Sequence, residues 1–101
     1  MSTLSRAEIE PILDNFPAPA HLLGPCVYRA RSADRLLYVG MSTNLRPRLR
    51  IHRNGAAWWR EMTCVDVQFY VGRKEALRHE WRAIHVEGPA YNRHRPRRTD
   101  Q

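Results

Sequence analysis

The sequence predicts a small α/β (α+β) domain in which helices flank a mainly antiparallel, three-stranded sheet. Its length of 101 residues suits one compact domain. Two short apolar runs enclose a polar turn, which is typical of a β-hairpin, and a third run alternates strictly between apolar and polar residues. Helical patterns precede, separate and follow these runs, so the order helix, hairpin, helix, strand, helix indicates a mixed domain.

Residues 1–22 are expected to form an N-terminal helical segment that packs on the domain. Ser5 and Glu8 have the spacing of a capping box, which opens a helix. Pro11 would then lie inside that helix, where its ring clashes with the preceding turn. A helix that begins nearer Glu10, with Pro11 in its first turn, is an equally good interpretation. The apolar side chains expected to face the domain are Ile9, Ile12, Leu13 and Phe16.

The predicted strands follow this segment. The hairpin comprises residues 26–30 and 36–40, joined by a short polar turn. The third strand covers residues 63–71, where every second side chain is expected to be buried. The residues on that face are Val65, Val67, Phe69 and Val71.

The second helix is located by its proline. Pro47 is tolerated only in the first turn, so Asn44 is the expected N-cap and the helix covers residues 45–53. Successive residues advance by about 100° around the axis. Leu45 and Leu49 then define the inward stripe, with Arg48 and His52 on its flank. The arginines predicted to point away are Arg46, Arg50 and Arg53.

The last helix is expected at residues 74–86 and repeats this pattern of a polar group on an apolar face. Its predicted buried stripe is Ala76, Leu77, Trp81 and Ile84. Glu80 lies within that stripe, and a carboxylate there is costly unless it is paired or bound to a cation. One interpretation is an internal Glu80–Arg48 ion pair with His52 beside it. The other is a polar cleft in which Glu80 lies near a metal and Arg48 near a phosphate.

The aromatic residues allow two interpretations as well. Tyr28 and Tyr38 lie on the hairpin strands, where tyrosine packs well, but both would also face a cleft on the sheet. Gly40 either ends its strand or lets a ligand approach the backbone closely. Trp58 and Trp59 either fill the core or offer a ring for base stacking.

Charge and composition narrow the class of partner. The net charge is +7, which favours a polyanion such as nucleic acid. The two cysteines are expected to be reduced thiols. No apolar run is long enough for a membrane helix, and the first residues do not resemble a secretory signal, so we expect a soluble cytoplasmic protein with no membrane partner.

An ordered set of motifs resembles the GIY-YIG nuclease family. Cys26-Val27-Tyr28 stands where that family has its first triplet, and Tyr38-Val39-Gly40 where it has its second. The stretch "YVGMSTNLRPRLRIH" supplies an arginine and a histidine one turn later. Downstream, "EWRAIHVEGPAYN" supplies a glutamate, a proline and an asparagine in the family's order. Cys26 replaces the first glycine of the first triplet. The resemblance assigns residues 23–92 to the nuclease domain, followed by a basic tail at residues 93–101.

The resemblance implies roles for these residues. Glu80 would bind one divalent metal ion, Mg²⁺ or Mn²⁺, and Arg48 would contact the scissile phosphate. Tyr28, Tyr38 and His52 would orient or deprotonate the attacking water, with Tyr28 favoured as the activating group. Asn92 either anchors the tail or, by resemblance, orients groups of the site. The residues expected to contact substrate in addition are Gly40, Arg46, Arg50 and Asn92.

The implied function is metal-dependent hydrolysis of DNA phosphodiester bonds by a monomer or homodimer. Contacts would go to the DNA backbone, so strong sequence specificity would require a partner protein for targeting. Alternatives are a non-catalytic nucleic-acid-binding module on the same fold, an RNA-directed nuclease, or a basic structural protein whose inward polar residues form only an ion-pair network.

Overall fold

The computed structural model describes residues 1–15 and 20–92 of the chain. Phe16, which was predicted to pack on the domain, and the basic tail at residues 93–101 lie outside the described residues. The elements are β1 (Ser2–Ser5), α1 (Arg6–Asp14), the 3₁₀ turn η1 (Ala20–Leu22), β2 (Leu23–Ser32), β3 (Arg35–Asn44), α2 (Leu45–Gly55), the 3₁₀ turn η2 (Ala57–Arg60), β4 (Cys64–Phe69) and α3 (Arg73–Glu87). None of the helices in the described ranges is long and apolar enough to cross a membrane.

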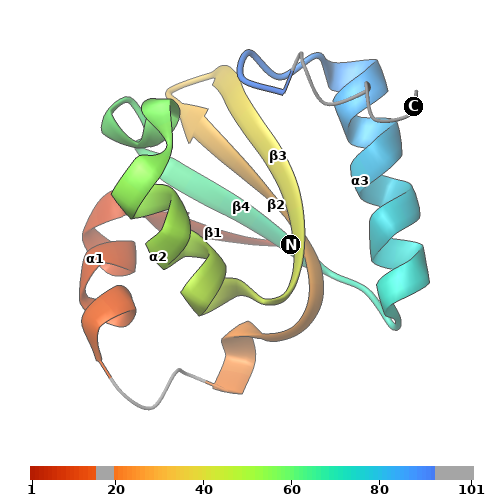
Figure 1. Ribbon diagram of the computed structural model, residues 1–101, viewed down its shortest axis with the longest axis horizontal. Coiled ribbons are helices and arrows are strands. Elements are labelled where there is room, and N and C mark those ends of the chain that lie inside the picture. The colour runs from red at the N-terminus through yellow and green to blue at the C-terminus, as the bar shows by residue number, and fades with distance from the viewer. Residues whose placement is uncertain (16–19, 93–101) are drawn as a thin grey trace.

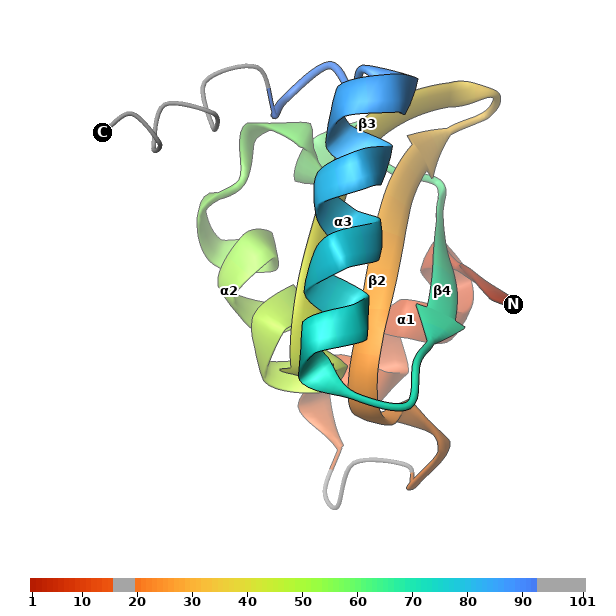
Figure 2. The ribbon, with the colours of Figure 1, turned by 90° about the vertical axis from the view of Figure 1, so that its right-hand side faces the viewer.

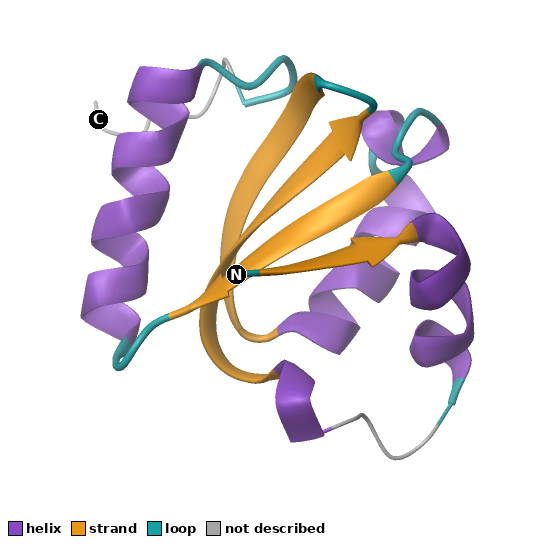
Figure 3. Ribbon diagram, turned by 180° about the vertical axis from the view of Figure 1, so that it is seen from behind, coloured by secondary structure: helices purple, strands orange, loops and turns teal. Residues whose placement is uncertain are grey.

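The predicted α+β class and the antiparallel arrangement are confirmed. The strands form one sheet in the order β1-β4-β2-β3, and every neighbouring pair is antiparallel. Helices α1 and α2 lie on one face of the sheet and α3 on the other (Figures 1 and 2). The view from behind shows the strands as a twisted layer between these helices (Figure 3).

The sheet has a fourth strand that the sequence did not predict. Strand β1 pairs with β4 from Ser2 opposite Val67 to Ser5 opposite Cys64. Its sequence, STLS, is short and has a single apolar residue. The periodicity that reveals a strand needs several alternating residues, so an edge strand of this kind gives no signal. The hairpin strands are also longer than predicted, because pairing continues to Leu23 and Asn44.

The capping box at the start of α1 is confirmed. Glu8 N donates to Ser5 Oγ at 3.2 Å, and Ser5 N donates to Glu8 Oε1 at 2.8 Å. The alternative start near Glu10 is therefore wrong, and Pro11 lies inside the helix. Helix α2 begins at Leu45, as the position of Pro47 predicted, and it extends through Gly55. Gly88 ends α3 in the left-handed conformation, with φ of 60°.

Two hydrophobic cores lie on opposite faces of the sheet. The larger core, beneath α1 and α2, includes Ile9, Leu13, Leu37, Leu49, Met62 and Val65. The smaller core, beneath α3, consists of Val27, Val39, Ala76 and Ala83 with partly buried neighbours. The expected buried stripe of α3 is wrong in part, because Leu77 and Trp81 are exposed. The two alanines instead make the contact that the larger side chains were predicted to make.

Candidate active site

Pairing of β2 with β3 brings the two motif tyrosines to the same face of the sheet. Tyr28 lies opposite Gly40, and Ala30 lies opposite Tyr38. Residues two apart on a strand share a face, so both tyrosine rings point toward the side that α2 covers. The ring centroids lie 6.1 Å apart. The predicted convergence of the two triplets is therefore present in the fold.

His52 reaches the tyrosines from α2. Its Nε2 lies 2.7 Å from the hydroxyl group of Tyr28, within hydrogen-bonding distance. The His52 ring also meets Tyr38 edge-on, at 5.0 Å between centroids. The positions on α2 that the sequence placed beside the inward stripe thus bring the imidazole to both tyrosines.

Burial sets the protonation of this pair. Desolvation raises the pKa of Tyr28 well above its ordinary value, so the phenol keeps its proton at neutral pH. Desolvation, followed by the charge of Arg48, lowers the pKa of His52 from 6.5 to about 4. The imidazole is therefore neutral and carries a single ring N–H. In the tautomer that has this proton on Nδ1, Nε2 accepts the hydroxyl proton of Tyr28.

Two opposite charges act on the Tyr28 hydroxyl. The carboxylate of Glu80 raises the pKa of Tyr28, and the guanidinium of Arg48 lowers it. These side chains come from α3 and α2, on opposite faces of the sheet. Arg48 takes part in none of the ion pairs among the described residues, so the predicted Glu80–Arg48 pair is absent there. Arg48 is exposed, and a ligand can reach it.

The other arginines of α2 do not form the outward face that the sequence predicted. Arg46 is buried at 4% exposure, and its Nε donates to the carbonyl oxygen of Ile12 at 2.9 Å. Arg53 pairs with Asp14 at 3.0 Å. Only Arg50 is fully on the surface. Helix α1 packs along this side of α2. A helical projection shows which residues share a side of one helix, but it does not show which other element covers that side.

Arg46 is therefore a structural residue: its side chain is buried against α1, and the prediction that it points outward is wrong. The space above Gly40 is also occupied by the protein itself. A β-carbon at Gly40 would lie 2.5 Å from Cζ of Tyr28, so the space above this glycine holds the tyrosine ring. The close approach that the sequence predicted is real, but a side chain of the site makes it in place of a ligand.

Asn92 is buried, and its amide is committed to the backbone of β3. Its Oδ1 accepts from Val39 N at 2.9 Å, and its Nδ2 donates to Val39 O at 3.0 Å. Val39 separates Tyr38 from Gly40 in the second triplet. Of the two expectations for Asn92, the structure favours an anchor that holds the backbone of the site.

Trp58 is a supporting residue whose role was left open by the sequence. It is buried, its ring stacks on Tyr38 at 5.2 Å with an interplanar angle of 19°, and it lies 4.8 Å from the His52 ring. The signal for this contact is the position of Trp58 just after α2, six residues beyond His52. Trp58 therefore supports the rings from behind and is not available to stack on a base.

Glu80 has the chemistry of a ligand for a hard cation. The residues described contain no cluster of three or more His, Cys, Asp or Glu side chains that could enclose a metal. Both cysteines are free, and burial raises the pKa of the Cys26 thiol to about 11, which leaves it protonated. A half-buried carboxylate fits a Mg²⁺-like ion, which retains waters and is bound through one or two carboxylates plus phosphate.

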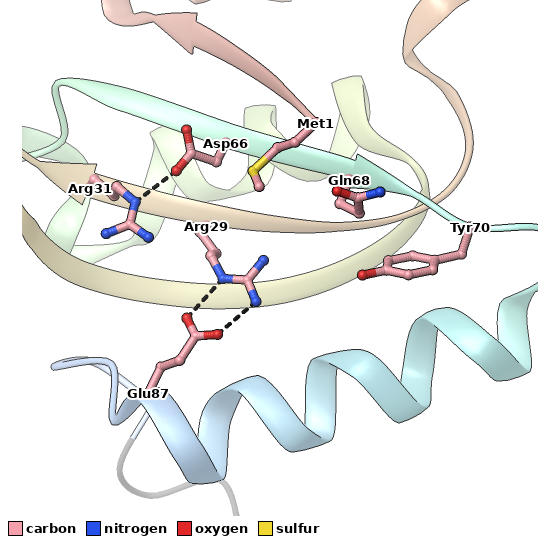
Figure 4. A pocket seen from close by; sticks show the side chains of 7 residues that line it. All are labelled: Met1, Arg29, Arg31, Asp66, Gln68, Tyr70 and Glu87. Atoms are coloured by element: carbon pink, nitrogen blue, oxygen red, sulfur yellow. Dashed lines mark hydrogen bonds and ion pairs between the residues drawn. The ribbon is translucent and has the colours of Figure 1, made fainter.

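A cavity in another part of the molecule is lined by charged side chains (Figure 4). It has a volume of about 410 Å³, and its lining includes Arg29, Arg31, Asp66 and Glu87. Arg29 forms a bidentate pair with Glu87 at 2.8 Å, and Arg31 pairs with Asp66 at 2.7 Å. Its charges are thus paired with one another, and none of the predicted site residues contributes to it.

The comparisons with known proteins agree with this arrangement. A family model described as the GIY-YIG catalytic domain matches residues 24–93, which is well over half of the chain. No match was found among curated proteins, and none among solved structures. The matched region contains both tyrosines, the Arg48 and His52 pair, Glu80 and Asn92. The chain therefore belongs to the GIY-YIG family of nucleases.

Proposed function

We propose that this protein is a metal-dependent endonuclease that hydrolyses phosphodiester bonds of DNA at the site formed by Tyr28, Tyr38, Arg48, His52 and Glu80. The observation that carries the proposal is the 2.7 Å hydrogen bond between the Tyr28 hydroxyl and the neutral His52. A phenol with a high pKa is a poor base alone. Coupled to an unprotonated imidazole, it can pass its own proton on while it accepts another.

In the proposed reaction a water molecule attacks the phosphorus. The water gives a proton to Tyr28 Oη, and the phenolic proton moves to His52 Nε2. A new P–O bond forms, the bond to the leaving oxygen breaks, and that oxygen takes a proton from solvent. A bound phosphodiester adds negative charge near His52, which raises its pKa and favours the transfer.

Arg48 is proposed to bind the scissile phosphate. Its side chain is exposed, yet its charge acts on both Tyr28 and His52. A guanidinium matches two phosphate oxygens through parallel hydrogen bonds, and it stabilises the charge that builds up on them in the transition state. Tyr38, which packs against both Trp58 and His52, orients the water or the phosphate.

Glu80 is the residue that would hold the divalent cation. Such an ion, Mg²⁺ or Mn²⁺, stabilises negative charge on the phosphate and on the leaving oxygen when it is bound. A single carboxylate ligand leaves the remaining coordination positions to phosphate oxygens and water.

DNA is the proposed substrate because the chain is basic and offers backbone contacts. With a net charge of +7 and an exposed Arg50 on α2, it favours phosphate contacts that do not depend on sequence. One site per chain gives a nick in a duplex. Cleavage of both strands would need two chains or two successive events.

Plasmid nicking with Mg²⁺ or Mn²⁺ tests the proposal, with wild type and Glu80→Ala prepared side by side. We expect nicking by the wild type and its loss in the variant, while an Arg50→Ala control still nicks. Equal activity in wild type and Glu80→Ala would point to a contaminating nuclease and would overturn the metal-site assignment. Binding without cleavage of any DNA or RNA substrate, with either metal, would favour the non-catalytic module.

A further inference from the structure

The outer surface of α3 carries an unusual side chain for a solvent-exposed helix. Trp81 is 65% exposed, and Leu77, one turn earlier, is 36% exposed. The other two tryptophans of the chain, Trp58 and Trp59, are buried. A large aromatic ring left in water is a feature of binding surfaces, because such a ring offers much contact area with little conformational freedom to lose.

The Trp81 ring is held in a fixed orientation. His85, one turn later, stacks on it with 3.9 Å between centroids and an interplanar angle of 28°. The Nδ1 atom of His85 lies 2.9 Å from the carbonyl oxygen of Trp81, so this nitrogen donates a proton and the imidazole plane is fixed. The two stacked rings form a flat platform with one face of Trp81 available.

A row of cations runs beside this platform. Lys74, Arg78 and Arg82 are spaced four residues apart, so they lie along one side of α3 with about 6 Å between successive positions. All three are exposed, and none takes part in the ion pairs found among the described residues. A hollow of about 130 Å³ lies between Arg78, His79 and Arg82. The surface therefore combines an aromatic platform with unpaired positive charge.

This platform is next to the candidate active site. Glu80 precedes Trp81, and successive residues are about 100° apart around a helix. Because Glu80 is half-buried, that rotation takes the Trp81 position away from the sheet to the outer surface. Leu77 lies one turn before Glu80 and about 60° from it, between the carboxylate and the platform. A nucleic-acid strand that has one phosphate near Glu80 and continues over α3 would contact Leu77 and then Trp81.

We infer that the α3 surface formed by Leu77, Trp81, His85 and the basic row Lys74, Arg78 and Arg82 binds an unpaired segment of the nucleic-acid substrate, with a base stacked on Trp81. This inference rests on the proposed nuclease function and narrows its substrate to DNA that has a single-stranded part beside the cleaved bond. Bases in a duplex are stacked on each other and cannot reach the ring, whereas every unpaired base has a face to offer. A second copy of this basic chain would place like charges against the row.

Tryptophan fluorescence tests this inference, because Trp81 is the exposed tryptophan. The titration uses a short single-stranded deoxyoligonucleotide and, in parallel, a blunt duplex, both in EDTA so that no cleavage occurs. Saturable quenching by the single strand, absent in Trp81→Phe, supports stacking. Wild-type emission that does not change when the single strand is bound overturns the inference without the need for any variant.

Affinity measured with a labelled oligonucleotide gives a second readout. Trp81→Ala should weaken single-strand binding by roughly 5- to 150-fold, whereas Trp81→Phe, which keeps a ring, should stay much closer to wild type. Val86→Ala is the matched control, since Val86 is 76% exposed on the same helix and lies outside the platform. Equal affinity of Trp81→Ala and wild type would overturn the inference, as would a change from dimer to monomer in Trp81→Ala.

The test separates this inference from the proposed function. Nicking that depends on Glu80, without quenching at Trp81, would leave the nuclease proposal standing and reject the platform. The opposite result is that the wild-type protein shows quenching, and Trp81→Ala weakened binding, while neither protein cleaves any substrate. That result would reject the nuclease proposal and support the binding surface. When both hold, Trp81→Ala should slow cleavage of a substrate with a single-stranded flap more than it slows nicking of a relaxed duplex.

Discussion

The hydroxyl group of Tyr28 lies 2.7 Å from Nε2 of His52, and the ring of Tyr28 lies directly above Gly40 on the neighbouring strand. These two contacts fix the phenol between a glycine that makes room for its ring and an imidazole that is hydrogen-bonded to its hydroxyl group. The hydrogen bond joins β2 to α2, so its geometry depends on the packing of the whole larger core.

Gly40→Ala should damage both the fold and the site. The added methyl group would lie 2.5 Å from Cζ of Tyr28, so the ring must move away from His52. We expect a loss of about 1–3 kcal/mol in the free energy of unfolding, measured in urea. Cleavage should fall in the fraction that remains folded, and the ¹⁵N shift of His52 Nε2 should change. Gly55→Ala, where no atom lies within 4 Å, should leave all three unaffected, and a normal His52 signal in Gly40→Ala would contradict the explanation.

Arg48→Ala and Arg50→Ala should behave differently, although both remove an exposed arginine of α2. The first should reduce the cleavage rate by about 100- to 1,000-fold with little loss of affinity, because the charge is needed most in the transition state. The second should weaken binding mildly and make it less dependent on salt. Single-turnover rates and salt titrations check both, and similar effects of the two changes would reject a special role for Arg48.

Arg46→Ala should lower stability without a specific effect on DNA. Its buried guanidinium bonds the carbonyl oxygen of Ile12, so its loss leaves that oxygen unsatisfied and opens a cavity between α1 and α2. We expect a cost of about 1–3 kcal/mol in chemical unfolding. Arg50→Ala is again the control, with a change within about 0.5 kcal/mol. If Arg46→Ala had normal stability but bound DNA more weakly, Arg46 would be a residue that contacts the substrate.

His52 should make stability depend on pH in a defined window. It takes up a proton near pH 6.5 when unfolded but only near pH 4 when folded. Between these values the unfolded state binds more protons, so the contribution of His52 to stability is complete above about pH 6.5 and is lost as the pH falls toward 4. Unfolding at about pH 7 and about pH 5 should show a larger decrease for wild type than for His52→Gln. Equal decreases would mean that the imidazole titrates normally in the folded protein.

Asn92→Ala should loosen the backbone of the second triplet. Both hydrogen bonds to Val39 disappear inside the protein, which should cost about 1–3 kcal/mol of stability. Hydrogen exchange of the Val39 amide should accelerate more than that of amides in β4. Asn54→Ala is the control, because it makes the same change of residue type at an exposed position on α2. Unchanged protection at Val39 would show that the anchor is not needed.

Much of this arrangement could be predicted from the sequence because it depends on local rules. The capping box at Ser5, the helix start fixed by Pro47 and the half-buried position of Glu80 all follow from spacing within one element. The errors involve contacts between elements. Arg46 faces α1, and a helical projection of α2 contains no information about α1. Trp81 is apolar but exposed, because small alanines of α3 pack against the sheet in its place.

The residues that follow α3 also determine how the sheet meets other chains. Ala90 N and Tyr91 N donate to Leu36 O and Leu37 O at 3.2 and 2.8 Å, and the Asn92 amide continues this pairing along the outer edge of β3. An open strand edge is a template for pairing with a neighbouring molecule. Proteolysis just before Ala90 would therefore do two things at once: it would release the anchor of the second triplet, and it would expose an edge on which copies of the chain can aggregate.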